Sequence, residues 1–266
     1  MINNKKQNNK KFHIIPIISI IVITRNSELH IKNCIKSVYF AKEIILIDNG
    51  SIDKTSILAI KYKVKVLYYN NWLGFGPQKN RALCLSNGHW VLSLDVDERI
   101  TNELSNEIQS KIYKLDLNNS YEFPRLSWFH KRIILEIGWW PDHIIRLFKR
   151  KNGFFTNSIV HEKVVSNHIL KQMNFYFEHD AYRNLDIVLD KINRYSSDYS
   201  YSMYFRKKNT NIFSIFFHTI WSFFKMYFIK KGFLIGVLGI ILSIIFSFGT
   251  FLKYAKLILL NKCKLN

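Results

Sequence analysis

The sequence predicts an α/β protein built on a doubly wound, mostly parallel sheet with flanking helices, followed by an apolar helical tail. Strand-like apolar runs alternate with segments of helical periodicity through residues 17–94. An acidic residue directly follows two of these runs, and parallel sheets bind ligands at the carboxyl ends of their strands. Residues 207–266 are dominated by long apolar segments. These observations indicate one sizeable domain with a C-terminal appendage.

The first strand is expected at residues 17–23, where the run IISIIVI is apolar and largely β-branched, as in strands covered on both faces. Ile31, Ile35 and Val38 share one face of the helix expected at residues 29–39. The other elements of the first half are strands at 43–47, 64–69 and 90–94 and helices at 53–61 and 78–85. Strands and helices that alternate at this pace indicate βαβ units and a parallel sheet.

The second half is expected to hold fewer regular elements. A helix is predicted at residues 103–117, short β-like runs fill residues 121–178, and helical periodicity returns at residues 186–206. The start of the chain, residues 1–16, is polar and basic and is expected to be disordered. It lacks the apolar core and the small-residue cleavage site of a secretory signal.

Two apolar segments close the chain. Residues 212–228 contain one charged side chain, Lys225, and residues 233–252 contain none. About 20 apolar residues can just span a bilayer, yet the internal glycines and the flanking lysines equally suit helices that lie in the membrane interface. A buried helical hairpin is a third arrangement, but the apolar run is longer than most core helices. Residues 207–266 are therefore predicted to associate with a membrane, by spanning it or by lying on it.

The charge balance favours anionic partners. Lys and Arg outnumber Asp and Glu by 39 to 19, which gives a formal net charge of +20. Phosphate-bearing substrates, an anionic membrane face and nucleic acid all suit this charge, although a coding sequence rich in A and T would also enrich lysine. A nucleic-acid binder gathers its cations along one groove, whereas lysine here is spread along the chain, so no nucleic-acid partner is expected. The three cysteines match no metal-binding or redox spacing, which indicates reduced thiols in a cytosolic compartment.

Two acidic motifs follow predicted strands. Asp95 and Asp97 come directly after the strand at 90–94 and can share Mg²⁺ or Mn²⁺, because hard cations take carboxylate and diphosphate oxygens together. Such a cation would neutralise the charge that builds up on a leaving diphosphate. Asp48 ends the strand at 43–47, where it can accept hydrogen bonds from a nucleoside. A solvated turn or a helix cap is the plainer alternative for these motifs.

The order ISIIVITRN, EIILIDNGSIDKT, GFGPQKNRAL and VLSLDVDE resembles glycosyltransferase family 2, whose fold is named GT-A. More narrowly, GFGPQKN, GWWPDHIIRLFKR and the later VHE are similar to the lipopolysaccharide core β-1,4-glucosyltransferases. The resemblance runs from about Ile17 into the C-terminal tail. It implies a GT-A domain at residues 17–206, with a nucleotide-sugar-binding half at 17–100 and an acceptor half at 101–206.

The resemblance also implies roles for single residues. Thr24 and Asp48 match positions that hold the base and ribose of the nucleotide, and Lys79 matches a basic position near the base and the acidic pair. Asp95 and Asp97 match the metal–diphosphate motif. The family usually reads DSGSTDGT where this chain has DNGSIDKT, and both Asp positions are kept.

An inverting transfer needs a carboxylate that takes the proton from the acceptor hydroxyl. Many family members carry a Glu-Asp pair well after the metal motif, but this chain has VHE in the corresponding place. We predict Glu162 as the base, with Asp142 as the rival, and His161 as a contact for the metal or the diphosphate. Arg146 is expected to bind the donor by balancing phosphate charge. Asp142 could instead simply pair with Arg146, and His161 could be a structural histidine.

These features predict a membrane-associated inverting glycosyltransferase. Its nucleotide-sugar donor is expected to be UDP-glucose and its acceptor a lipid-linked saccharide, such as the lipopolysaccharide inner core, at the cytoplasmic face of the bacterial plasma membrane. Another glycan or a lipid phosphate would suit the same motifs as acceptor. A nucleotidyltransferase would begin with a Gly-rich phosphate loop, where this chain has Thr24-Arg25-Asn26. A non-catalytic basic protein that binds membrane or nucleic acid is the alternative from another class.

Overall fold

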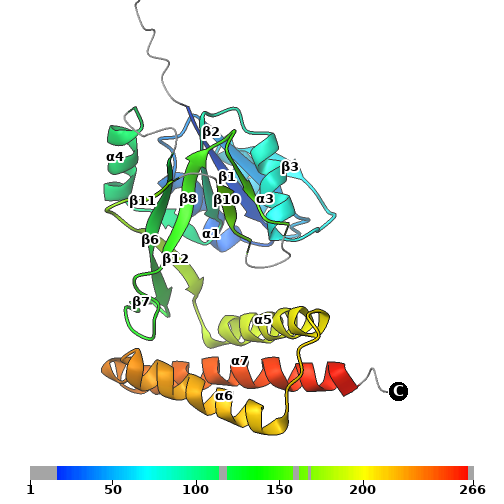
Figure 1. Ribbon diagram of the computed structural model, residues 1–266. Coiled ribbons are helices and arrows are strands. Elements are labelled where there is room, and N and C mark those ends of the chain that lie inside the picture. Colours follow the sequence, from blue (N-terminus) through cyan, green and yellow to red (C-terminus); the bar gives the residue numbers. More distant parts are fainter. Residues whose placement is uncertain (1–16, 114–118, 158–161, 167–168, 263–266) are drawn as a thin grey trace, which may run out of the picture.

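The computed structural model describes residues 17–113, 119–157, 162–166 and 169–262. A sheet flanked by helices forms one body, and a layer of long C-terminal helices lies beneath it in Figure 1. The chain passes from the sheet to this layer between β12 (Phe177–Tyr182) and α5 (Leu185–Phe205).

The first half of the chain forms the parallel part of the sheet. Four strands lie in the order β3-β2-β1-β4, and each neighbouring pair is parallel. Every residue of the central strand β1 is buried, which explains its uninterrupted apolar sequence. The strands match their predicted positions to within one residue at each end: β1 (Ile18–Thr24), β2 (Glu43–Asp48), β3 (Lys65–Tyr68) and β4 (Trp90–Asp95).

Helices cover both faces of this parallel half. Ile20 and Val22 of β1 point into a core shared with α1, α2 and α4, whereas Ile21 and Ile23 pack with α3 on the opposite face. The alternation follows from the two-residue period of a strand, and it confirms the doubly wound arrangement. The helices are α1 (Glu28–Ser37), α2 (Thr55–Lys61), α3 (Phe75–Cys84) and α4 (Asn102–Lys111). The last helix ends before the predicted boundary at residue 117, and residues 114–118 lie outside the described residues.

The second half extends the sheet with mixed pairing. β8 (His143–Lys149) lies between β4 and β6 (Asn119–Phe129) and is antiparallel to both. β12 pairs in parallel with β6 and antiparallel with β5 (Glu98–Ile100). The sequence predicted only short β-like runs here, whereas β6 extends over 11 residues. The shorter strands are β7 (Arg132–Ile133) and β11 (Ile169–Gln172) beside β6, and β9 (Gly153–Phe155) and β10 (Val164–Ser166) in a separate two-stranded sheet.

The C-terminal layer contains four further elements after α5. They are α6 (Ile212–Phe224), the π-helix η1 (Lys225–Ile229), the 3-10 helix η2 (Gly232–Ile235) and α7 (Val237–Lys262). α7 packs against both α5 and α6 and runs between them in Figure 1. A core cluster joins the layer to the sheet body, with Ile134 and Ile137 on one side and Ile192, Ile235 and Leu242 on the other.

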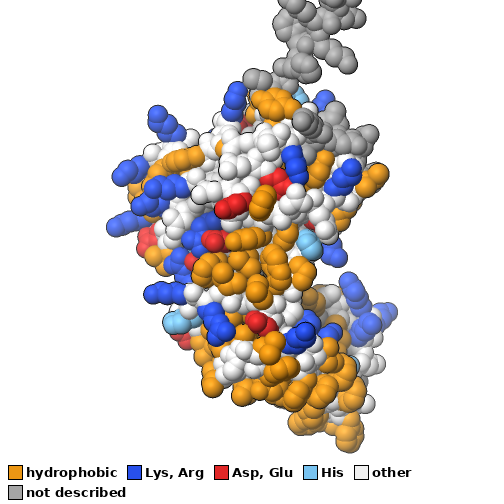
Figure 2. Space-filling view, turned by 90° about the vertical axis from the view of Figure 1, so that its left-hand side faces the viewer, with side chains coloured by type: hydrophobic (Ala, Val, Ile, Leu, Met, Phe, Trp, Pro, Cys, Tyr) orange, Lys and Arg blue, Asp and Glu red, His pale blue; other side chains and the backbone are white. Residues whose placement is uncertain are grey.

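The layer turns most of its apolar side chains outward. Only 6% of the segment Ile212–Ile229 is buried inside the protein, and 22% of the most apolar stretch of α7. Both segments are long and apolar enough to cross a membrane by length and composition. Figure 2 shows hydrophobic side chains gathered at the lower end of the molecule, where the layer lies. The layer is therefore not a hairpin buried in the protein core.

Candidate active site

The acidic residues predicted from the sequence lie where the parallel half of the sheet meets the mixed half. Asp95 is the last residue of β4, Asp97 lies in the following turn, and Glu98 begins β5. β1 pairs in register with both β2 and β4, which puts Asp48 at the same edge as Asp95. The side chain of Asp95 is 32% exposed and that of Asp97 is 22% exposed, whereas Glu98 is buried.

Two buried cations hold Asp95. Lys79 Nζ lies 2.8 Å from Asp95 Oδ1, and a terminal guanidinium nitrogen of Arg146 lies 2.8 Å from Oδ2. Burial alone would raise the pKa of Asp95, but the two cations outweigh it and hold that pKa well below its ordinary value. Asp95 is therefore a fixed anion whose two oxygens already have partners.

Lys79 reaches this edge from helix α3. Its buried ammonium also lies 2.5 Å from Glu162 Oε1. Burial would lower the pKa of Lys79, yet the carboxylates of Asp95 and Glu162 raise it above its ordinary value. The helix approaches closely because Gly76 has no side chain: a Cβ there would lie 1.8 Å from the carbonyl oxygen of Thr156. The second glycine of GFGPQKN therefore lets Lys79 enter the site.

Glu98 is a buried acid that the sequence analysis did not identify. Arg146 donates to Glu98 Oε1, and the backbone N–H of Asp95 donates to Glu98 Oε2 at 3.0 Å. Burial raises the pKa of Glu98, and the charge of Asp95 adds to this, while Arg146 opposes it. Arg146 thus joins Asp95 and Glu98 in one network, and its predicted contact with the donor phosphate stays a prediction.

Asp142 pairs with Arg125 and not with Arg146. Arg125 donates to Asp142 Oδ2 from Nε at 3.0 Å and from a terminal nitrogen at 2.6 Å. The other terminal nitrogen of Arg125 lies 3.9 Å from Glu98 Oε1. The Asp142 side chain is 39% exposed. It therefore lies at the rim of the charged network, connected to Asp95 through Arg125 and Glu98.

Asp97 faces a second and looser set of groups. His179 Nε2 lies 3.6 Å and Lys191 Nζ lies 3.7 Å from Asp97 Oδ2. Burial would raise the pKa of Asp97, but His179 and then Lys191 lower it below its ordinary value. His179 belongs to β12 and Lys191 to α5, so the turn after β4 is contacted from the sheet and from the helical layer. Neither of these two residues was identified from the sequence.

Thr24 and Asp48 lie at the end of the parallel strands, as predicted. Asp48 is buried and accepts hydrogen bonds from the Ser51 backbone N–H at 2.9 Å and from the Ser56 hydroxyl. The Thr24 hydroxyl is buried and has no hydrogen-bond partner among the described residues. Buried hydroxyls are almost always hydrogen-bonded, so Thr24 is a group that a bound ligand can satisfy. Asp48 already holds its own turn, and its contact with a nucleotide stays a prediction.

Asp95 and Asp97 suit a divalent cation only together with oxygen atoms from the bound donor and from water. No cluster of three or more His, Cys, Asp or Glu side chains that could hold a metal is found in the described part of the chain. Asp97 fits a direct metal ligand because it is partly exposed and its neighbours His179 and Lys191 stay at 3.6 Å or more. Both oxygens of Asp95 already bind cations. Diphosphate and water oxygens would complete the shell that Mg²⁺ or Mn²⁺ requires; His161, the other predicted contact, lies outside the described residues.

The fold and the site together define a glycosyltransferase of GT-A type. Its parallel half has the strand order β3-β2-β1-β4, a mixed second half follows, and the acidic turn lies at their junction. The sequence profile described as glycosyl transferase family 2 matches residues 19–175. The chain belongs to this family.

Several individual proteins are similar to this chain. A glycosyltransferase of Rickettsia typhi is 32% identical over 260 residues, which cover 90% of this chain and 86% of the relative. The lipopolysaccharide core biosynthesis glycosyltransferase LpsC of Rhizobium meliloti is 26% identical over 159 residues, 56% of this chain and 57% of LpsC. Among solved structures, S. aureus TarS in complex with UDP-GlcNAc is similar, with a TM-score of 0.45, 14% identity, and coverage of 88% of this chain and 80% of that chain.

Proposed function

We propose that this family 2 glycosyltransferase is a metal-dependent inverting enzyme that moves glucose from UDP-glucose to a lipid-linked saccharide. The acceptor proposed is the lipopolysaccharide inner core, at the cytoplasmic face of the plasma membrane. One observation carries the proposal: a partly exposed carboxylate, Asp97, lies next to Asp95, whose charge is fixed by two buried cations. The similarity to LpsC, which is named for lipopolysaccharide core biosynthesis, supports the acceptor class.

Donor binding is assigned to the edge where β1, β2 and β4 end. Thr24 offers a buried hydroxyl there that has no hydrogen-bond partner in the described part of the chain, and Asp48 fixes the adjoining turn. A divalent cation bound at Asp97 would supply Lewis-acid neutralisation of the leaving diphosphate. Thr24 and Asp48 then belong to the nucleoside end of the donor and Asp97 to its diphosphate end.

The cations around the acidic turn prepare the site for an anionic donor. Lys79 and Arg146 keep Asp95 ionised, and Lys191 adds positive charge beside Asp97. These groups are held by packing and ion pairs before any donor enters, so little reorganisation is needed when charge develops on the diphosphate.

Two carboxylates compete for the role of base. Each is paired with a cation through one oxygen, so their exposure distinguishes them. Glu162 is 13% exposed and its Oε1 is bonded to Lys79, which also binds Asp95. Asp142 is 39% exposed, and both hydrogen bonds from Arg125 end on its Oδ2. These surroundings favour Asp142 as the proton acceptor and Glu162 as the residue that positions Lys79, although the sequence had favoured Glu162 as the base.

The acceptor is expected to come from a membrane. The helical layer exposes apolar side chains, and the chain carries a formal charge of +20, which together suit an anionic, lipid-anchored substrate. A different glycan or a lipid phosphate would use the same donor site. Donor and acceptor therefore need separate tests.

A donor panel with a mass-spectrometric readout tests the proposal. The full-length protein is incubated with Mn²⁺, one nucleotide sugar at a time, and a lipopolysaccharide-core or other lipid-linked acceptor. We expect a hexose to be added with UDP-glucose, with release of UDP and inversion at the anomeric carbon. Release of no nucleotide diphosphate from any donor would contradict the transfer, and release of pyrophosphate would indicate a nucleotidyltransferase instead.

A further inference from the structure

We propose that the C-terminal layer docks flat on an anionic bilayer, with α7 in the plane of the membrane and not across it. The layer comprises α5, α6, η1, η2 and α7. This inference rests on the membrane attachment in the proposed function and adds how the chain meets the bilayer. Two observations support the in-plane arrangement. They are the anchoring contacts along the whole of α7 and the charge of the layer.

The connection that precedes α7 is fixed to the sheet body. The backbone N–H of Ile137, in the segment before β8, donates to the carbonyl oxygen of Lys230 at 2.9 Å. Ile235 is buried in the same cluster as Ile134 and Ile137. The turn between η1 and η2 therefore lies against the body that carries the active site.

The middle of α7 also contacts the sheet body and α5. The ring of Trp139 lies edge-on to that of Phe246, with centroids 5.9 Å apart and an interplanar angle of 88°. Gly249 faces α5 closely, since a Cβ there would lie 3.0 Å from Ile192 Cγ2. These contacts hold α7 along the sheet body and along α5 at once.

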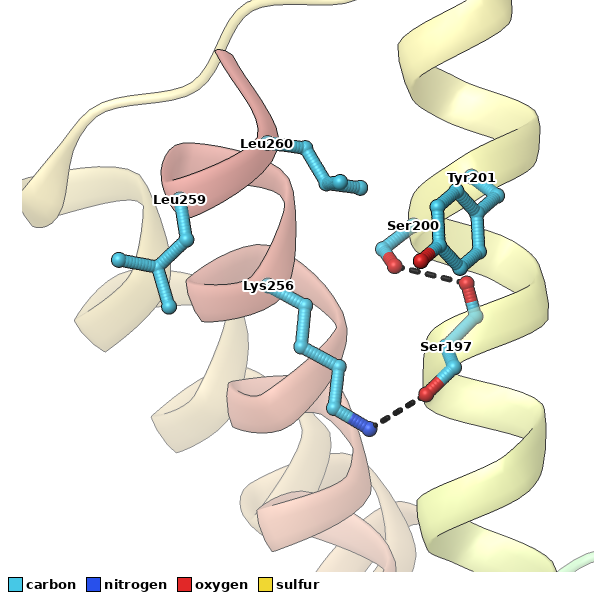
Figure 3. A pocket seen from close by; sticks show the side chains of 6 residues that line it. All are labelled: Ser197, Ser200, Tyr201, Lys256, Leu259 and Leu260. Atoms are coloured by element: carbon cyan, nitrogen blue, oxygen red, sulfur yellow. Dashed lines mark hydrogen bonds between the residues drawn. The ribbon is translucent and has the colours of Figure 1, made fainter. Parts of the chain in front are cut away.

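The C-terminal part of α7 is bound to α5 through a lysine. Lys256 Nζ lies 2.8 Å from the carbonyl oxygen and Oδ1 of Asn193 and from the hydroxyls of Ser196 and Ser197. Figure 3 shows this side chain reaching from α7 across to Ser197 on α5, beside a small pocket that Leu260 also lines. An ammonium ion with four oxygen partners fixes this end of the helix to a polar neighbour.

These anchors are incompatible with a helix that crosses the bilayer. Ile235 and Lys256 are separated by about 30 Å of helix at 1.5 Å per residue, which is about the hydrocarbon thickness of a bilayer. A crossing helix would put these two residues on opposite sides, yet Ile235 packs on the sheet body and Lys256 is bound to α5, the helix that continues from that body. α5 carries Asp186, Asp190 and Asp198 and cannot follow α7 into hydrocarbon, where charged side chains are costly.

The exposed surface of α6 and α7 has the chemistry of an interfacial surface. Its exposed apolar side chains include Phe213, Phe217, Ile220, Val237, Ile244 and Phe248. Beyond Asp198 the sequence contains nine Lys and one Arg but no Asp or Glu. Cations beside an exposed apolar helical face attract anionic lipid while the apolar side chains enter the boundary of the acyl region. The occupant of this face is therefore an anionic bilayer.

Single-cysteine labelling tests the orientation in sealed membranes. Lys231→Cys and Lys262→Cys, which replace exposed residues before and at the end of α7, are made separately in the full chain with Cys84→Ser and Cys263→Ser. The buried Cys34 is kept. In inverted inner-membrane vesicles, a membrane-impermeant maleimide is expected to label both positions, and in right-side-out vesicles neither. Labelling of one position from each side would overturn the in-plane arrangement and leave membrane attachment standing.

Vesicle flotation tests the lipid partner itself. The full-length protein is expected to float with phosphatidylcholine vesicles that contain phosphatidylglycerol, and less with phosphatidylcholine alone or at high salt. Ile220→Asp should lower the fraction bound by about tenfold, because it puts a charged side chain where an apolar one enters the boundary of the acyl region. Ile57→Asp on α2 is the matched control, since Ile57 is 68% and Ile220 67% exposed. Failure to float on any vesicle would overturn the membrane attachment itself, whereas the donor panel would still test glycosyl transfer.

Discussion

The acidic edge of the sheet and the C-terminal layer place charged and apolar groups in opposite ways. At the edge, Lys79, Arg146 and Glu98 are buried and paired with one another or with Asp95. In the layer, apolar side chains are exposed, and every Lys, Arg, Asp or Glu beyond Asp198 is a cation. Buried charges are tolerated when they are paired, and large exposed apolar faces mark a surface that meets another apolar phase. The edge therefore suits an anionic donor and the layer a membrane.

The largest effect should come from Asp97→Asn, which changes the acidic edge of the sheet and leaves the C-terminal layer unaltered. Loss of a metal ligand removes several kcal/mol of charge stabilisation, so we expect the transfer rate to fall by at least about 10³-fold. The rate of nucleotide diphosphate release measures this. Vesicle binding should be unchanged, and Asp186→Asn on α5 is the control carboxylate. A loss below tenfold would contradict a direct role for Asp97.

The next largest effects should come from variants of the two candidate bases, Asp142 and Glu162. If Asp142 takes the proton, Asp142→Asn should lower the rate of transfer by about 10²-fold or more with donor binding unchanged. Glu162→Gln should instead weaken donor binding, because Lys79 loses a partner and Asp95 is held less firmly. Single-turnover rates and donor affinities, measured for both variants, distinguish the two effects. The reverse pattern would return the base to Glu162.

A smaller effect should come from Lys191→Met. Lys191 lies on α5, the helix that contacts both the acidic edge and α7. Lys191 faces Asp97, while the next residues Ile192 and Asn193 contact α7. A partly exposed ion pair contributes little, about 1 kcal/mol or less, so the donor Kd should rise by about threefold with vesicle binding unchanged. Lys262→Met, at the end of α7, should leave the donor Kd unchanged. An equal effect of both variants would show that general charge matters and not the position of Lys191.

The smallest effect concerns stability and pH. The pKa of Asp97 is lowered in the folded protein, so its ionised form stabilises the fold above the unfolded-state pKa of about 3.9. This stabilisation is lost as the pH falls through the lowered folded-state pKa. The difference in unfolding free energy between the parent protein and Asp97→Asn should therefore shrink between pH 6 and pH 3 in urea titrations. A difference that grows towards acid pH would contradict the cationic surroundings of Asp97.

The parallel half of the fold was predictable because its signals are local. The run IISIIVI and the runs of β2 and β4 each specify a largely buried strand, whereas β3 is a partly exposed strand. The strand ends carry Asp48 and Asp95. The doubly wound arrangement follows from their alternation with helices. The mixed pairing of β8, β6 and β12 was not predictable, because antiparallel and parallel partners are chosen by contacts far apart in the sequence.

The same distinction applies to the site. Asp95 and Asp97 stand out as a short motif, whereas Glu98 reads as one more acid in a polar turn. Its burial depends on Arg146, which is 48 residues away. His179 and Lys191 reach Asp97 from β12 and α5, and no local pattern marks either of them. Sequence periodicity also could not decide how the apolar tail meets a membrane, since the anchors of α7 are tertiary contacts.

Calorimetric titration of a nucleotide sugar tests the central claim most directly. The full-length protein is titrated with UDP-glucose in the presence of Mn²⁺, in the presence of EDTA, and as the Asp97→Asn variant with Mn²⁺. We predict saturable binding only for the parent protein with Mn²⁺. Equal binding in all three titrations would contradict a metal-dependent donor site at Asp97.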